Sequence, residues 1–313
     1  MSVVTHVKET LNKRDDIPLI TAIVAVFFWS ATPLFVRGIS ASTTTVIFWR
    51  FVVATPIMCV IAFATGGRPT VDLARRSFLP GVLFAIALIT GLAAFRETSI
   101  ANATLIMSLQ PVIVLLIAPK LFKEQVRVTQ IVSAAVAMVG VTIFIFAAAS
   151  TSGASLKGDL LAFANLFLWT GYFLLSKHAR SSGTHSWSFL AMVFFWSLIF
   201  VSPWALTTSN DIGGMTSKDW LLLCSMVFLP AVLGHGMMTW AQRHVDVTVL
   251  SLLMLLQPVL GAIGAWLVFE QSINALQILG GALVLGALAA IVRENRAVSA
   301  AEAAMAADLL ENH

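Results

Sequence analysis

The chain has 313 residues, of which 58% are hydrophobic and only 11% are charged, with a formal net charge of +4 at pH 7. A soluble domain carries roughly 25% charged residues, so this chain has too few polar side chains to cover a surface that faces water. The composition therefore excludes a soluble globular protein and predicts an integral membrane protein.

Ten apolar segments follow one another along the chain, and each is long enough to cross a bilayer as a helix of about 20 residues. They are apolar on all faces and about twice the length of a barrel strand, which favours helices over a β-barrel. The connections between them are short, so the fold class we expect is all-α. The segments span residues 18–36, 43–64, 78–95, 101–119, 126–148, 158–177, 187–206, 219–241, 247–268 and 273–292.

Polar segments precede and follow the ten helices. Residues 1–17 lack the short apolar core and the cleavage site of a signal peptide, so we expect the first apolar run to stay in the membrane. Residues 293–313 form an Ala- and Glu-rich tail for which we expect a helix. With the N-terminus inside, fourteen Lys and Arg residues fall on the inside and four in the outside loops. This bias places both terminal segments in the cytoplasm.

The chain contains an internal repeat. TLIMSLQPV at residues 104–112 is closely copied by SLLMLLQPV at residues 251–259. Two further pairs of copies are FLPGVL with FLPAVL, and FFWSATPLFVR with FLWTGYFLLSK. We therefore expect two five-helix units, residues 18–148 and 158–292. Because five is odd, the second unit is inverted relative to the first, which predicts a substrate site near the membrane midplane between the units.

The glutamine–proline pair occurs at the same place in each unit, as Gln110-Pro111 and Gln257-Pro258. A proline inside a helix removes one backbone donor and presses against the carbonyl four residues earlier, so both helices should be kinked. A kinked backbone beside a polar amide is tolerable in a membrane where it is buried in protein or faces water. Two interpretations follow: the pairs are matched walls of a central cavity, or they hold helices together by packing and hydrogen bonds.

Aromatic and amide side chains form a second group of candidates. The sixth helix carries Asn165, Trp169 and Tyr172 on one face at helical spacing, and Trp29 lies on the matching face of the first helix. Such a stripe can stack on the apolar part of a substrate and hydrogen-bond to its polar group. The alternative is aromatic packing without a ligand. Asn102, near the edge of the glutamine-bearing face of the fourth helix, is a further candidate.

Ionisable residues inside or next to the apolar segments have several interpretations. His235 lies between two glycines in the eighth helix, where it could contact the substrate, carry a proton or hydrogen-bond to a tightly packed neighbour. Arg50, about two turns into the second helix, would either lie near a substrate carboxylate or extend outward to water. Glu124 and Glu270, at the starts of the fifth and tenth helices, are expected to cap those helices.

Motifs for catalysis are missing from the apolar segments. They contain no metal-ligand spacing, Gly-rich phosphate loop, nucleophile elbow or paired catalytic carboxylates. There is also no basic aromatic patch for nucleic acid. We therefore expect no enzyme activity, no metal, no cofactor and no nucleic-acid partner.

Together these features resemble the EamA-type branch of the drug/metabolite transporter (DMT) superfamily. The resemblance rests on ten helices, two inverted five-helix repeats, a Trp in the first helix of each, and the QPV…E stretch in helices 4–5 and 9–10. It covers nearly the whole chain and implies a bacterial inner-membrane carrier, of a kind that often exports amino acids and related metabolites by alternating access. Trp29, Trp169, Gln110 and Gln257 fall in helices that resemble the cavity-lining helices of that family.

The function we expect is a secondary active transporter that exports amino acids or small amphipathic metabolites across the inner membrane. The expected partners are a small-molecule substrate, the lipid bilayer, and a coupling proton or other ion, for a monomer or a homodimer. The first alternative is an exchanger of nucleotide sugars or phosphorylated metabolites on the same fold, although few buried charges suit a multiply charged phosphate poorly. A membrane-embedded enzyme and a channel are further alternatives.

Overall fold

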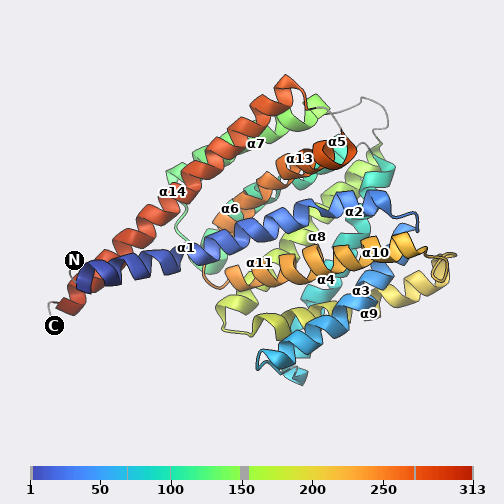
Figure 1. Ribbon diagram of the computed structural model, residues 1–313, viewed down its shortest axis with the longest axis horizontal. Helices are drawn as coiled ribbons and strands as arrows, with labels where there is room; N and C mark the ends of the chain where they lie inside the picture. Colours follow the sequence, from blue (N-terminus) through green and yellow to red (C-terminus); the bar gives the residue numbers. More distant parts are fainter. Residues whose placement is uncertain (1–2, 69, 99, 149–154, 271–272, 312–313) are drawn as a thin grey trace.

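The computed structural model describes residues 3–68, 70–98, 100–148, 155–270 and 273–311. Within these residues every regular element is helical, as the composition predicts (Figure 1). The first two residues of the predicted N-terminal segment and the last two of the predicted tail lie outside the described residues.

The helices of the first half form the first five membrane spans, and the first and fourth of these spans are each broken into two helices. Their bounds are α1 Val3–Ser30, α2 Thr32–Gly38, α3 Thr43–Ala64, α4 Val71–Glu97, α5 Ile100–Met107, α6 Gln110–Phe122 and α7 Val128–Ala148.

Among the described residues of the second half, two helical segments are not α-helical, the π-helix η1 and the 3₁₀ turn η2. The bounds are α8 Leu156–Ser181, α9 Ser186–Thr208, α10 Ser217–Met226, η1 Val227–Gly234, α11 His235–Ala241, α12 Val247–Leu253, η2 Met254–Leu256, α13 Gln257–Phe269 and α14 Ala275–Glu311.

The number of predicted spans is confirmed, because the described residues contain ten helical stretches long and apolar enough to cross a membrane. The ends of three helices differ from the prediction by more than six residues. The first helix, α1, begins at Val3 and not at residue 18, so it includes most of the predicted N-terminal segment. The third helix begins at Val71 because the Thr70 hydroxyl accepts a hydrogen bond from the Leu73 backbone N–H (3.2 Å) and caps it. The tenth helix, α14, continues through the predicted tail as far as Glu311.

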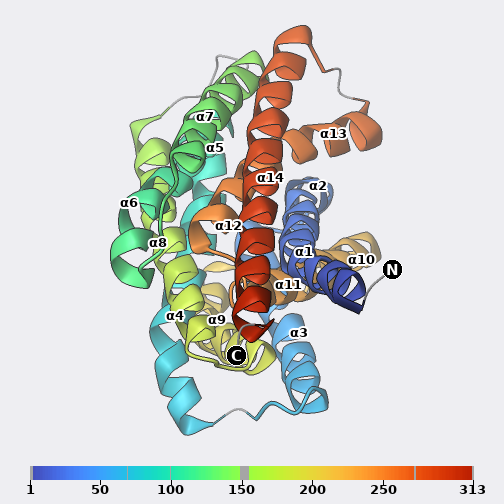
Figure 2. The same ribbon diagram turned by 90° about the vertical axis from the view of Figure 1, so that its left-hand side faces the viewer.

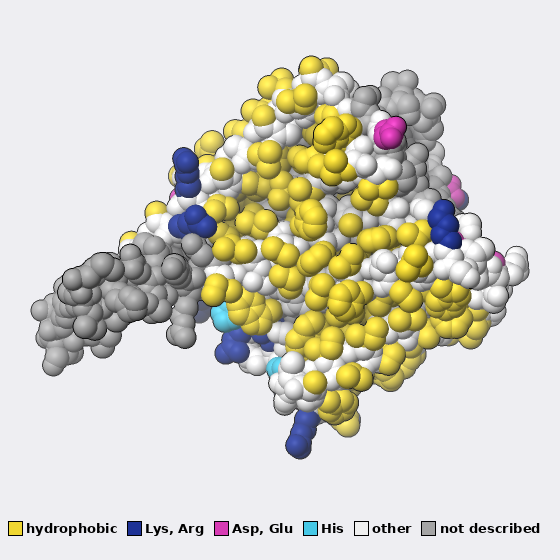
Figure 3. Space-filling view, viewed as in Figure 1, with side chains coloured by type: hydrophobic (Ala, Val, Ile, Leu, Met, Phe, Trp, Pro, Cys, Tyr) yellow, Lys and Arg dark blue, Asp and Glu magenta, His cyan; other side chains and the backbone are white. Residues whose placement is uncertain are grey.

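The surface has the pattern of a protein that spans a bilayer. In Figure 3 hydrophobic side chains cover the broad middle of the visible face, and the charged side chains lie near its edges. The start of α1 and the end of α14 project from the same end of the bundle, as an even number of crossings requires (Figure 1). The chain is therefore a multi-pass membrane protein.

Each half interrupts a helix immediately before its glutamine–proline pair. In the first half α5 ends at Met107 and α6 begins at Gln110. In the second half α12 ends at Leu253, η2 follows, and α13 begins at Gln257. The kinks predicted from the two prolines are therefore confirmed, and they occupy equivalent places in the two halves.

The equivalence continues beyond the kinks. Lys123 and Glu270 both have a positive φ, 57° and 55°, and they are separated by the same number of positions as the two glutamines. The helix that follows each of them is capped by a glutamine side chain, with the bonds Arg127 N to Gln130 Oε1 (3.1 Å) in α7 and Asn274 N to Gln277 Oε1 (3.0 Å) in α14.

The two halves pack against each other through equivalent pairs of helices. The first span of each half packs on the third span of the other half. Thus α1 packs on η1 and α11 of the eighth span, and α8 packs on α4 of the third span. Two other contacts join equivalent helices directly, α3 with α9 and α7 with α14. Figures 1 and 2 both show α7 and α14 side by side. This exchange pattern is the one expected of two repeats related by a pseudo-two-fold axis.

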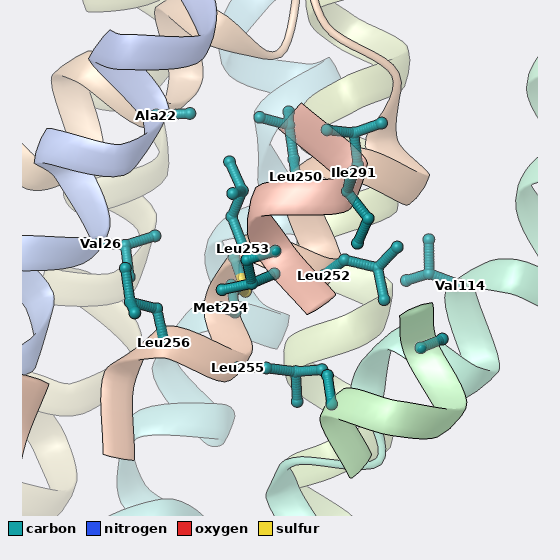
Figure 4. Packing of buried hydrophobic residues seen from close by; sticks show 14 of the residues in the cluster. Ala22, Val26, Val114, Leu250, Leu252, Leu253, Met254, Leu255, Leu256 and Ile291 are labelled. Carbon is teal, nitrogen blue, oxygen red and sulfur yellow. The ribbon is translucent and has the colours of Figure 1, made fainter. Parts of the chain in front are cut away.

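Two large hydrophobic clusters fill the interior. The ninth span lies within the first cluster, where residues of α12 and η2 are surrounded by α1, α6 and α14 (Figure 4). The second cluster lies among α3, α4, α9 and the eighth span. Trp169 of α8 packs against both clusters, so the middle of α8 lies where the two clusters meet.

Candidate substrate site

A cluster of aromatic rings surrounds the His235 side chain, which is 3% exposed. His235 is the first residue of α11, directly after the π-helix η1, and π-helical turns are frequent at functional sites. Rings from four other spans approach it. Their centroid distances from the imidazole are 4.9 Å for Trp29, 5.1 Å for Phe84, 5.9 Å for Phe194 and 6.1 Å for Trp169.

Further ring contacts close this group into one unit. The Tyr172 ring lies 4.7 Å from Phe84 and 5.4 Å from Trp169, and Trp169 lies 5.8 Å from Trp29. We use the name aromatic cluster for Trp29, Phe51, Phe84, Trp169, Tyr172, Phe194 and His235. Four predicted site residues therefore meet in it, namely Trp29, Trp169, Tyr172 and His235. They come from both halves of the chain.

The two glycines beside His235 make this packing possible. A Cβ on Gly234 would lie 2.8 Å from Cδ1 and Nε1 of Trp29. A Cβ on Gly236 would lie 2.2 Å from the Trp187 ring. Trp29 Nε1 also donates a 3.1 Å hydrogen bond to the Pro230 carbonyl in η1. The tight helix contact predicted from the flanking glycines is present, and within the described residues neither ring nitrogen of His235 has a hydrogen-bond partner.

The phenylalanines of the cluster are the residues that sequence reasoning missed. Phe84 and Phe194 are both fully buried, yet the chain has 21 phenylalanines and nothing in the sequence marks these two. Only their position on α4 and α9, facing His235, gives them a place in the site.

Arg50 of α3 borders the cluster and is 6% exposed. The sequence leaves open whether it extends outward to water, and the structure shows that it stays buried. The ring of the next residue, Phe51, lies 5.9 Å from Phe84 and 5.4 Å from Phe194.

The two predicted asparagines lie on different helices, Asn165 in α8 and Asn102 in α5, and at different depths along the bundle. Asn165 Nδ2 donates a 2.6 Å hydrogen bond to the Ala87 carbonyl, so it joins α8 to α4 one turn away from Trp169. Asn102 Nδ2 lies 3.4 Å from Asp159 Oδ1, near the start of α8. Since Asp159 precedes Trp169 by about 15 Å along the helix axis, Asn102 lies outside the aromatic cluster.

The two predicted glutamines start α6 and α13. Gln110 is 4% exposed, and its Nε2 has no hydrogen-bond partner among the described residues. Gln257 is partly buried. Neither side chain is hydrogen-bonded to the aromatic cluster within the part of the chain that the structure describes. Their roles as cavity walls or as contacts between helices therefore stay predictions.

A buried polar network at the end of α8 is not expected from the sequence, where Lys177 and Arg180 resemble loop residues. Lys177 Nζ donates to the Val245 carbonyl (2.7 Å), and Arg180 Nε donates to the Thr239 carbonyl (2.9 Å). Next to this network is a cavity of about 360 Å³. It is lined by Leu121, Phe122, Lys123, Glu124, Lys177, His178, Ser181 and Asp246.

The expectation that Glu124 caps its own helix is wrong. Its carboxylate accepts the backbone N–H of Val247 (2.7 Å) and of Thr248 (3.2 Å), so it caps α12 in the other half. The physical reason is the left-handed residue Lys123, which turns the chain before α7 begins. The equivalent left-handed residue in the second half is Glu270 itself, which is exposed.

At the opposite end of the bundle two carboxylates join the halves. Asp211 accepts hydrogen bonds from the Ser42 backbone N–H (2.6 Å) and from the Thr45 hydroxyl. Asp219 accepts from the Ser40 backbone N–H (2.8 Å). The Thr45 and Ser42 donors hold the pKa of Asp211 below its usual range. We call these five residues the Asp211–Asp219 network.

Possible metal ligands are not clustered in the described part of the chain. Within the described ranges, no group of three or more His, Cys, Asp or Glu side chains could hold a metal ion. What the geometry offers is a buried aromatic group between two repeats, with a polar network at each end.

The sequence matches the EamA-like transporter family over residues 16–146 and again over residues 156–293. The chain belongs to the EamA-like transporter family. It is therefore a membrane transporter and not an enzyme. The two matches correspond to the two halves described above, so this EamA-like transporter consists of two EamA domains.

Curated relatives of this EamA-like transporter cover most of the chain at low identity. An uncharacterized transporter of Bacillus subtilis is 27% identical over 255 residues, which is 77% of this chain and 82% of the relative. An uncharacterized transporter of Archaeoglobus fulgidus is 23% identical over 87% of this chain and 95% of its own. A probable amino-acid metabolite efflux pump of Escherichia coli is 22% identical over 59% of this chain and 65% of its own.

A solved crystal structure has the same fold. It superposes with a TM-score of 0.75 over 87% of this chain and 96% of the solved chain, at 16% sequence identity. At that identity the likeness shows the fold alone.

Proposed function

We propose that this EamA-like transporter is a secondary active transporter that exports amino acids or small amphipathic metabolites by alternating access. The observation that carries the proposal is the aromatic cluster, because its rings come from both halves and enclose a histidine without a hydrogen-bond partner among the described residues. The efflux assigned to the Escherichia coli relative supports the direction of transport.

Alternating access requires the two halves to move relative to each other around a central site. The rings of the aromatic cluster are packed against one another, so a substrate can enter only if they separate. The Asp211–Asp219 network joins the halves at one end, and Glu124 joins them at the other. We infer that these two contacts break in turn as the site opens to each side.

The same proposal includes orientation and location. The bias of Lys and Arg supports placing both termini in the cytoplasm, with the protein in a bacterial inner membrane. The Asp211–Asp219 network then lies at the outer face. We propose residues 18–148 and 158–292 as the limits of the two five-helix units. We also propose that a proton or another ion is coupled to transport.

Counterflow in proteoliposomes tests the proposal. Liposomes that contain purified protein are loaded with one unlabelled amino acid, and uptake of the same labelled amino acid is followed against a gradient. A saturable overshoot is expected for at least one amino acid or related metabolite. Uptake that never saturates and shows no overshoot would indicate a channel, and overshoot only with nucleotide sugars or phosphorylated metabolites would support the exchanger instead.

A variant pair makes the test specific to the site. His235→Ala removes the ring at the centre of the aromatic cluster and should reduce counterflow strongly. His178→Ala changes an exposed histidine on α8 and should leave counterflow near the wild-type rate. Equal rates in both variants would contradict the location of the site.

A further inference from the structure

Arg50 is a buried cation without a counter-charge in the described part of the protein. It is 6% exposed, and its Nε has no hydrogen-bond partner. The described residues form three ion pairs, and none of them includes Arg50. An unpaired guanidinium inside a membrane protein is costly, and such a residue is by default a candidate for function.

The carboxylates at the helix ends bind other groups. Asp211 and Asp219 accept hydrogen bonds from the first half, Glu124 caps α12, and Asp159 accepts a hydrogen bond from the Thr98 hydroxyl (2.8 Å). Each of these carboxylates therefore has its own partners near a helix end. No ion pair among the described residues includes Arg50, so its counter-charge is left for a ligand to supply.

Arg50 also lies at the edge of the proposed substrate site. Its neighbour Phe51 packs on Phe84 and Phe194, which both contact His235. An anionic group bound by Arg50 would therefore have the rings of the aromatic cluster beside it.

We propose that Arg50 binds a carboxylate of the substrate while the aromatic cluster packs the apolar part of the same molecule. This inference rests on the proposed transport function and narrows its substrate class to small monocarboxylates with an apolar or aromatic body. A guanidinium presents its donors in a planar fork that matches both oxygens of a carboxylate. One guanidinium balances one carboxylate, whereas a phosphate monoester carries nearly two charges at neutral pH.

The remaining polar groups of the cluster fit such a ligand. Within the described residues the Tyr172 hydroxyl and the Trp169 indole nitrogen have no hydrogen-bond partner. These two groups could hydrogen-bond to a second polar group on the substrate, such as the amino group or amide of an amino-acid derivative. The Tyr172 hydroxyl would act as the acceptor. The site is therefore selective for a carboxylate at one end and tolerant at the other.

Ligand-dependent thermal unfolding of the purified full-length protein tests this assignment. The probes are 3-phenylpropionate and its amide, 4-methylpentanoate and its amide, and phenyl phosphate, all at neutral pH. The acids should bind at least about tenfold more tightly than their amides, because a site built for a polar group rejects an analogue that lacks it. In Arg50→Gln this preference should disappear, and in Arg50→Lys the acids should bind about tenfold more weakly with the preference kept.

Arg76→Gln is the matched control, since Arg76 is exposed and its one ion pair among the described residues is with Asp72 on its own helix. It should leave the preference for acids unchanged. Because the ratio of acid to amide is measured within each variant, a general loss of stability does not imitate the effect. If Arg50→Gln does not fold, the Arg50→Lys variant decides the question.

Three results with the wild type would overturn the assignment: no acid stabilises the protein, the amides bind as tightly as the acids, or phenyl phosphate binds more tightly than the acids. It is also overturned if the preference for acids over amides survives in Arg50→Gln. Failure of the proposed function has a different signature. In that case the acids still bind through Arg50, but proteoliposomes show no counterflow. Counterflow of a substrate without a carboxylate, unchanged in Arg50→Gln, would remove only the role of Arg50.

Discussion

Trp29 Nε1 donates a 3.1 Å hydrogen bond to the carbonyl oxygen of Pro230, which lies 201 positions further along the chain. The bond joins the first span to the π-helix of the eighth span. It fixes the indole 4.9 Å from the His235 ring, so the geometry of the aromatic cluster depends on this contact between the two halves.

Trp29→Phe should lower the midpoint of thermal unfolding, because it removes the indole N–H that the Pro230 carbonyl accepts besides the His235 backbone N–H, at a cost of about 1 kcal/mol. Gly234→Ala should destabilise the protein by about 1–3 kcal/mol, since its Cβ would lie 2.8 Å from Trp29. Trp266→Phe serves as the control, because Trp266 is 51% exposed and should tolerate the change. The prediction fails if Trp29→Phe and Trp266→Phe unfold at the same temperature.

The contact between α7 and α14 depends on Gly140 and Gly280. A Cβ on Gly140 would lie 2.7 Å from the Gly280 carbonyl oxygen and 2.9 Å from Leu283 Cβ. Gly140→Ala should therefore destabilise the protein by about 1–3 kcal/mol in detergent unfolding experiments. Gly286→Ala on the same interface helix meets no atom within 4 Å and should be neutral or stabilising by up to about 1 kcal/mol. If the two variants lost the same free energy of unfolding, the close approach of α7 and α14 at Gly140 and Gly280 would be contradicted.

Glu124 and Glu270 look alike in sequence but should respond differently to mutation. Glu124→Ala leaves the N–H groups of Val247 and Thr248 unpaired and should cost about 1–2 kcal/mol. Glu270→Ala changes an exposed side chain and should stay within about 0.5 kcal/mol of the wild type. Thermal unfolding of the two variants side by side measures the difference. An equal effect would support the expectation that each caps its own helix.

The Asp211–Asp219 network should hold the two halves together at one end of the bundle. Asp211→Asn removes the charge that accepts from Ser42 and Thr45, so the halves should separate more often. Spin labels can be attached at Thr44 and Gly213 after the two cysteines of the chain, Cys59 and Cys224, are replaced. The distance between the two labels should be longer in Asp211→Asn than in the protein with Asp211. Asp72→Asn is the control, because the one ion pair that Asp72 forms in the described part of the chain is an exposed pair with Arg76.

The pH dependence of that distance follows from the lowered pKa of Asp211, which is caused mainly by the Thr45 hydroxyl and the Ser42 donors. A carboxyl group whose pKa is depressed in the joined state stabilises that state above its ordinary pKa of about 3.9, and the stabilisation is lost as the pH falls through the lower value. The distance should therefore be constant above about pH 5 and lengthen only below about pH 4. Lengthening between neutral pH and pH 5 would point to another group.

The helix breaks at the two Gln-Pro pairs show which features can be predicted from the sequence and which cannot. Pro111 and Pro258 interrupt their helices as expected, because a missing backbone donor acts on the four residues before it, whatever surrounds the helix. The place of the two glutamine side chains could not be predicted in the same way. Gln110 is buried and Gln257 only partly so, although their local sequences are nearly identical.

Sequence by itself determined the membrane class, the ten spans and the two repeats of this EamA-like transporter, because hydrophobic length and backbone chemistry are local properties. Only the tertiary structure decided which side chains meet. Phe84 is fully buried against His235 while Phe167 is 62% exposed, and no local pattern separates them. The same holds for Arg50, whose isolation is visible only when every neighbouring helix is in place, since packing between distant segments sets the partners of a buried charge.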